Sequence, residues 1–161
     1  ISPLFVFKDG KLPDYLDFSG YCCFNKLYKK SIFDKLRFPE GKLSEDLYIY
    51  FQTMYYSKKI CTTSELLYCY SIMRKGSLCN AMPEKQIFDS FRACQHTTKF
   101  MIKNNIDKKH FVIWRELVSN NHIDGLRVLK ERKFEARISE LDNKYKKLLK
   151  IIDFHIDNLK K

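Results

Sequence analysis

The sequence contains, at residues 38–46, the stretch Phe38-Pro39-Glu40-Gly41-Lys42-Leu43-Ser44-Glu45-Asp46. A residue that precedes proline resists the helical conformation, and Gly41 suits the turn that follows. Ser44 is a favoured N-cap residue, and acidic side chains in a first helical turn complement the helix dipole. We therefore expect a turn over 38–41 and a helix from Glu45 to about Ser57, with Ser44 as its cap.

Apolar residues in this helix recur at helical spacing, which predicts a single inward face formed by Leu47, Tyr50, Phe51, Met54 and Tyr55. Upstream, residues 29–36 are long enough for two helical turns, and Leu27 and Tyr28 are expected in the core. Short apolar runs predict strands, which lie at residues 3–7, 21–24, 59–63 and 66–73.

The second half of the chain predicts helices. Pro83 suits a first helical position, and the helix after it presents an apolar stripe and stops at Asn104-Asn105; the stripe is Ile87, Phe91, Cys94, Thr98 and Met101. The next helix spans 108–119, with Phe111, Trp114, Leu117 and Val118 as its apolar surface. Asn120-Asn121 is expected to break it before another helix begins at Ile123.

The last segment predicts one long helix with a heptad-like apolar seam, formed by Phe134, Ile138, Leu141, Tyr145, Leu148, Ile152, His155 and Leu159. We expect this seam to pack against the preceding helix. The alternative is a partner helix in a homo-oligomer. The elements together predict a helix-rich α/β to α+β chain, with residues 1–80 holding the few strands and residues 81–161 forming a helical region.

The composition limits the classes of function. Thirty Lys and Arg against 19 Asp and Glu give a net charge of +11, which attracts anions such as nucleotide phosphates, acidic lipid headgroups or nucleic acid. No Arg-Lys block interleaved with stacking aromatics rises above the background, so no nucleic-acid partner is expected. The six Cys form no Cys-x-x-Cys pair, which argues against zinc and favours reduced thiols in the cytoplasm. No apolar run has the ~20 residues that a membrane-spanning helix needs.

Four short elements follow one another along the first half of the chain: Asn25-Lys26-Leu27-Tyr28, Phe38-Pro39-Glu40-Gly41, Glu45-Asp46, and Tyr68-Cys69-Tyr70 with Arg74-Lys75-Gly76-Ser77. Over about positions 20–78 this series resembles the C-terminal half of a bacterial family 2 glycosyltransferase. That resemblance implies part of a GT-A fold, and an inverting transfer of a sugar from a nucleotide-sugar to a glycan or lipid-linked acceptor in surface polysaccharide biosynthesis.

The resemblance also implies roles for individual residues. Asp46 would be the base that takes the proton of the acceptor hydroxyl, with Glu45 beside it. Asn25 and Lys26 would position substrate oxygens, and Arg74 with Ser77 would bind the diphosphate. From the residues alone, the acidic pair also suits a helix cap, Asn25 a structural hydrogen bond, and Lys26 and Arg74 the surface.

The donor half of such an enzyme is missing from the sequence. The family binds Mg²⁺ or Mn²⁺ through an Asp-x-Asp motif in its N-terminal half, and Asp14-Tyr15-Leu16-Asp17 has the wrong spacing and position for it. The resemblance therefore predicts that this chain is a fragment of a parent enzyme, inactive alone, in which the metal is held elsewhere.

Two alternatives come from other classes: a helical protein-interaction module that uses the C-terminal helices, and a basic nucleic-acid-binding domain. For the parent enzyme, the net charge favours a cytoplasmic location with peripheral contact to an anionic membrane surface.

Overall fold

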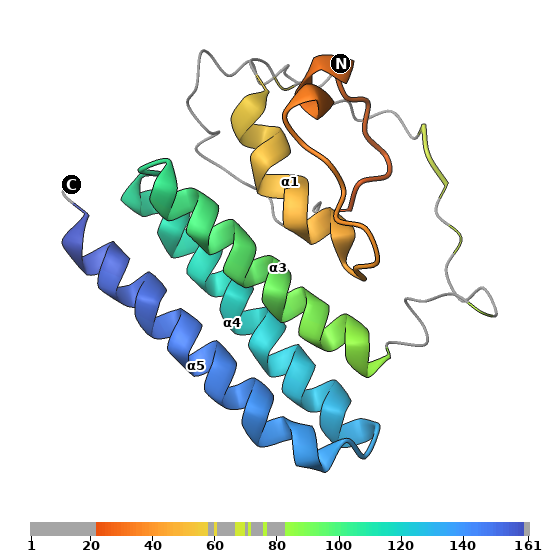
Figure 1. Ribbon diagram of the computed structural model, residues 1–161, viewed down its shortest axis with the longest axis vertical. Coiled ribbons are helices and arrows are strands. Elements are labelled where there is room, and N and C mark those ends of the chain that lie inside the picture. The colour runs from red at the N-terminus through yellow and green to blue at the C-terminus, as the bar shows by residue number, and fades with distance from the viewer. Residues whose placement is uncertain are drawn as a thin grey trace.

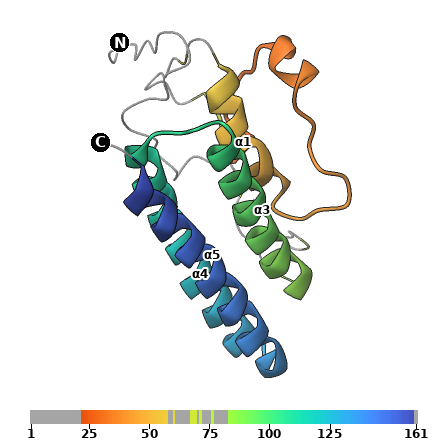
Figure 2. The same cartoon turned by 60° about the vertical axis from the view of Figure 1, so that its left-hand side comes forward.

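A computed structural model of the protein describes residues 22–57, 60, 67–69, 71, 76 and 83–159. The described part is helical, and its elements are η2 (Lys30–Asp34), α1 (Glu45–Tyr56), α3 (Glu84–Lys103), α4 (Lys108–Glu131) and α5 (Glu135–Asn158). Helices α3, α4 and α5 lie side by side as a bundle, and α1 lies along α3 (Figure 1). Figure 2 shows the same arrangement turned by 60° about the vertical axis.

The described residues contain no strand. The strand predicted at residues 21–24 is wrong for Cys22, Cys23 and Phe24, because these residues form bends. The strands predicted at 3–7, 59–63 and 66–73 fall wholly or largely outside the described residues. The α/β to α+β class and the boundary near residue 80 therefore stay predictions.

Helix α1 begins at Glu45 as predicted, but Ser44 does not cap it through its side chain. Ser44 has a left-handed backbone with φ of 60°, and its Oγ lies 2.8 Å from Oγ of Ser90 in α3. All seven residues from Leu47 to Thr53 are buried, so the single inward face was too narrow a prediction. Upstream, the predicted two-turn helix is the short 3₁₀ helix η2, and Leu27 is fully exposed where a core position was expected.

Helices α1 and α3 run in the same direction, and their contacts pair residues in the same order along both helices. Near the end of α1, the rings of Tyr55 and Phe100 meet edge to face, with centroids 5.2 Å apart. In the middle, Gln52 Nε2 lies 3.2 Å from His96 Nδ1. Helix α1 and the helices after residue 80 therefore contribute side chains to one core cluster.

Helix α3 buries every residue of its predicted stripe and ends at Lys103, with Asn104 as its C-cap. Asn105 takes the left-handed conformation, and the Ile106 amide donates to the Met101 carbonyl at 3.1 Å, which closes the helix end. Pro83 precedes the first helical residue and does not occupy it. The predicted stop at Asn104-Asn105 is confirmed.

Helix α4 does not break at Asn120-Asn121, so that prediction is wrong. Asn121 Nδ2 donates to the Leu117 carbonyl at 3.1 Å, which satisfies the amide inside the helix. Asparagine costs only about 0.7 kcal/mol in a helix interior. The burial of Val128 and Leu129 farther along the same helix outweighs that cost.

The seam of α5 packs against α4, as the sequence predicts. Its central residues Leu141, Tyr145, Leu148 and Ile152 are buried. Arg115 of α4 and Asp153 of α5 form an ion pair across the two helices. None of the helices in the described part is long and apolar enough to cross a membrane.

Candidate functional site

The acidic pair predicted as the site lies in the first turn of α1, and Asp46 is half-buried there. The Leu47 amide donates to Asp46 Oδ1 at 2.8 Å. Burial raises the pKa of the Asp46 carboxyl above its ordinary value; the Leu47 amide opposes this rise and the neighbouring Glu45 charge adds to it. A carboxylate whose pKa is raised by burial is a stronger base than a fully solvated one.

The segment that contains Asn25 and Lys26 lies against this turn. A backbone hydrogen bond from Cys23 also reaches the Asp46 carboxylate. Burial, followed by the charges of Asp46 and Glu45, raises the pKa of the Cys23 thiol. The structure therefore brings together two of the predicted elements that are about twenty residues apart in the sequence.

The Lys26 side chain contacts both the backbone of its own segment and a ring of α1. Its Nζ donates to the Cys22 carbonyl at 2.7 Å and lies 5.8 Å from the ring centre of Tyr50. Asn25 is exposed, with φ of 57°, a left-handed backbone that asparagine tolerates better than most residues. The Lys26 ammonium is thus fixed in place, whereas the Asn25 side chain faces solvent.

Aromatic rings join the remaining elements to this site. Burial, with Cys23, Tyr50 and Asp46 nearby, raises the pKa of Tyr28 to about 12. The rings of Tyr28 and Phe33 meet edge to face at 5.5 Å, and Phe33 stacks on Phe38 of the Phe38–Gly41 turn at 6.0 Å. The turn itself is present as predicted, with φ of 65° at Gly41.

The fourth element is described only in part. Tyr68 is half-exposed and stacks on Phe24, with ring centroids 5.4 Å apart. Tyr70, Arg74 and Ser77 lie outside the described residues, so the predicted diphosphate contacts stay predictions. Tyr68 thus contacts the residue just before Asn25, whereas the other three elements connect through Tyr28, Phe33 and Asp46 near the start of α1.

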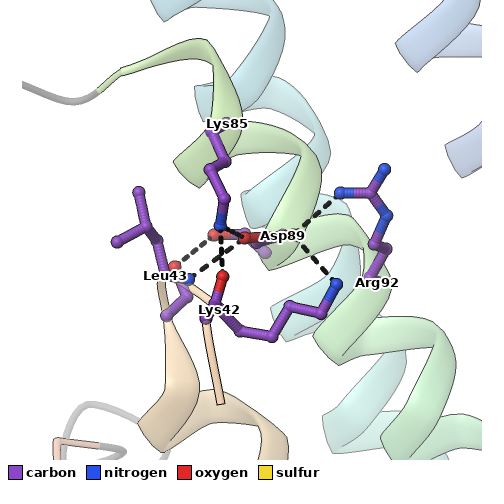
Figure 3. A network of polar contacts seen from close by, with 8 residues as sticks. Lys42, Leu43, Lys85, Asp89 and Arg92 are labelled. Carbon is purple, nitrogen blue, oxygen red and sulfur yellow. Dashed lines mark hydrogen bonds and ion pairs between the residues drawn. The ribbon is translucent and has the colours of Figure 1, made fainter. Parts of the chain in front are cut away.

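The structure adds one residue that the sequence reasoning missed. Asp89 of α3 is fully buried, and its Oδ2 accepts hydrogen bonds from the Leu43 amide at 3.0 Å and from Lys85 Nζ at 2.5 Å. Arg92 donates to its Oδ1 at 2.8 Å, and Lys42 Nζ lies 4.0 Å from the same oxygen (Figure 3). The only signal in the sequence is an i, i+4, i+7 pattern of charges on α3, formed by Lys85, Asp89 and Arg92. This pattern indicates a charged helix face, but it does not indicate the Leu43 amide 46 residues upstream.

The described residues do not supply a metal site. Nowhere in the part of the chain that the structure describes do three His, Cys, Asp or Glu side chains gather in a way that could hold a metal ion. The Mg²⁺ or Mn²⁺ that the resemblance implies has no fitting ligands among these residues.

One curated protein has a similar sequence. The chain is 30% identical over 109 residues to Glycosyltransferase GlyA of Streptococcus pneumoniae serotype 4. The match covers 67% of this chain and 16% of that protein, so the chain spans about a sixth of its relative's length. No family model matches the chain, and no solved structure matches it. The similarity supports a glycosyltransferase relationship.

Proposed function

We propose that this chain forms the acceptor side of the active site of a family 2 glycosyltransferase with a GT-A fold, as part of a longer enzyme. In that enzyme an acceptor hydroxyl attacks the anomeric carbon of a nucleotide-sugar with inversion. The bond to the diphosphate breaks, and Asp46 takes the hydroxyl proton. The donor half of the longer enzyme supplies the nucleotide site together with Mg²⁺ or Mn²⁺.

One observation carries this proposal. The half-buried carboxyl of Asp46 has a raised pKa, and it lies beside Glu45 and against the segment of Asn25 and Lys26. A helix cap at the protein surface needs no such burial, because solvated carboxylates already complement the helix dipole. A general base gains from it, because its proton affinity rises toward the working pH.

The neighbouring residues take supporting roles in this proposal. Asn25 faces solvent and offers an amide to acceptor oxygens, while the fixed ammonium of Lys26 stabilises negative charge near the transferred group. Arg74 and Ser77 bind diphosphate oxygens. The acceptor is a glycan or a lipid-linked sugar of surface polysaccharide biosynthesis.

Charge supports a location for the longer enzyme. Lys-rich helical faces and the net charge of +11 favour contact with the anionic cytoplasmic face of a membrane.

Homo-oligomerisation through α5 would need the outer face of this helix, because the seam is already buried against α4. On that outer face Ile151 is 50% and Phe154 is 69% exposed. That burial weakens the alternative of a helical assembly module.

The test is nucleotide release by the longer protein from a panel of UDP-glucose, UDP-galactose, UDP-N-acetylglucosamine and GDP-mannose. We expect release of UDP or GDP from at least one donor, with a faster rate when the acceptor is added. The absence of release from every donor, combined with strongly salt-dependent binding to DNA or RNA, would instead establish the basic nucleic-acid-binding alternative.

A further inference from the structure

The carboxylate of Asp89 connects the helical region to the residues that lead into α1. Leu43 is three residues before Asp46, and its amide donates to Asp89 Oδ2 at 3.0 Å. Lys85 Nζ reinforces this contact, because it donates both to the Gly41 carbonyl at 2.7 Å and to Asp89 Oδ2 at 2.5 Å. Residues 41–43 are therefore held to α3 at two backbone positions (Figure 3).

The same few residues contain a backbone conformation that needs support. Ser44 has φ of 60°, a left-handed value that costs a residue other than glycine about 1–2 kcal/mol. Such conformations persist only where the surrounding structure holds them. On one side of Ser44 lies the Leu43–Asp89 contact, and its own Oγ lies 2.8 Å from Oγ of Ser90.

The charges around Asp89 make this contact strong. Burial favours the protonated form, but hydrogen bonds from Lys85, the Leu43 amide and Arg92 hold the pKa of the Asp89 carboxyl below its ordinary value. A buried carboxylate that accepts charge-assisted hydrogen bonds fixes its donors more firmly than a neutral acceptor does.

We propose that Asp89 is a positioning residue that sets the depth and orientation of Asp46 through the Leu43 amide. The effect of Asp89 on kcat rests on the proposed function, whereas its effect on the pKa of Asp46 does not. Asp89 thereby adds a residue of α3 to the proposed site, beyond the segment in which the four sequence elements lie.

The direct test measures the pKa of the Asp46 carboxyl by NMR in the chain and in two variants, Asp89→Asn and Lys85→Met. Asp89→Asn leaves only a neutral acceptor for the Leu43 amide, and Lys85→Met removes the contact with the Gly41 carbonyl. Both changes therefore weaken the hold on residues 41–43, so both should expose Asp46 to solvent and lower its pKa toward the ordinary value. A purely electrostatic influence predicts opposite shifts, because one variant removes a negative charge and the other removes a positive charge. An unchanged pKa in both variants, or a rise in Lys85→Met, would overturn the inference.

Asp142→Asn is the matched control. Asp142 also accepts a hydrogen bond from a lysine, Lys146 of its own helix at 2.6 Å, and it lies 2.9 Å from His122 Nε2 of α4, so its contacts involve neither α1 nor α3. This variant should leave the pKa of Asp46 unchanged. A shift as large as that in Asp89→Asn would mean that any loss of stability moves Asp46, and positioning by Asp89 would be wrong.

A kinetic arm in the longer protein uses the donor that gives nucleotide release. Asp89→Asn should lower kcat about tenfold or more and leave the KM for the nucleotide-sugar within about twofold, because misplacement of one group by ~1 Å can cost a hundredfold in rate. Equal losses of kcat in Asp89→Asn and Asp142→Asn would contradict positioning. If no donor is turned over, the proposed function fails, and the NMR result still decides the role of Asp89.

Discussion

The ring of Phe24 lies stacked on the ring of Tyr68, with centroids 5.4 Å apart and an interplanar angle of 18°. These two residues are 44 positions apart: Phe24 immediately precedes the Asn25–Tyr28 element, and Tyr68 belongs to the last element of the series that suggested a glycosyltransferase. Their contact brings the last element against the residue that leads into the first one.

This stack predicts a measurable contribution to stability. An aromatic pair contributes about 0.5–1.5 kcal/mol beyond its buried area, so Tyr68→Ala should lower the free energy of unfolding by about 1 kcal/mol in urea denaturation. Leu67→Ala is the control, because Leu67 is 73% exposed and should tolerate the change. Equal losses in the two variants would show that the stack contributes nothing specific.

The ion pairs of Asp89 predict an acid-dependent loss of stability. The pKa of Asp89 is lower in the folded chain than in the unfolded chain, so its stabilisation is complete above the unfolded value of about 3.9 and is lost as the pH falls through the folded value. Asp89→Asn should therefore lower the free energy of unfolding by about 2 kcal/mol at pH 7. The gap from the wild type should shrink below about pH 4. A gap that stays constant down to pH 2 would contradict this assignment.

The close packing around Gly125 of α4 limits the size of the side chain that this position can hold. A Cβ atom there would lie 3.1 Å from Leu141 Cδ2 and 3.3 Å from Ile87 Cγ2. In Gly125→Ala the gain in helix propensity of about 1 kcal/mol offsets this crowding, and stability should change by less than about 1 kcal/mol. Gly125→Leu should lose about 3 kcal/mol in thermal or urea unfolding. A leucine that is tolerated as well as alanine would mean that the three helices do not meet closely here.

The sequence predicted those parts of the fold that local patterns determine. The stripe of α3, the start of α1 and the packing of the α5 seam follow from spacing and end signals, and the structure has all three. The break predicted at Asn120-Asn121 was wrong because a local propensity of about 0.7 kcal/mol per asparagine competes with burial along the whole of α4. Likewise, Leu27 is apolar but exposed, which no local pattern indicates.

For the candidate site, the residue types were accessible from sequence but their contacts were not. The acidic pair at Glu45 and Asp46 stands out next to a turn and a helix start. The burial that raises the pKa of Asp46, and the contact between Leu43 and Asp89, depend on segments that only tertiary packing brings together. Single-sequence periodicity contains no information on such pairs.

The cysteines predict a graded reactivity. Cys94 is fully buried, and burial raises the pKa of its thiol to about 12 against the effect of a hydrogen bond from Tyr145. Cys69 is exposed. Iodoacetamide at pH 8, with the labelled peptides identified by mass spectrometry, should modify Cys69 within minutes and Cys94 only after denaturation. Rapid labelling of Cys94 in the native chain would contradict the packing of α3 on α5.

The most direct test of the account compares Asp46→Asn with Ser57→Ala, a control at the other end of α1, in the longer enzyme. The measurement is kcat for glycosyl transfer, together with the dissociation constant of the nucleotide-sugar by calorimetry. Asp46→Asn should lower kcat by about a hundredfold or more and leave nucleotide-sugar binding within about twofold, because it removes only the base. Undiminished turnover in Asp46→Asn would show that Asp46 is not the base, and the proposed acceptor site would be wrong.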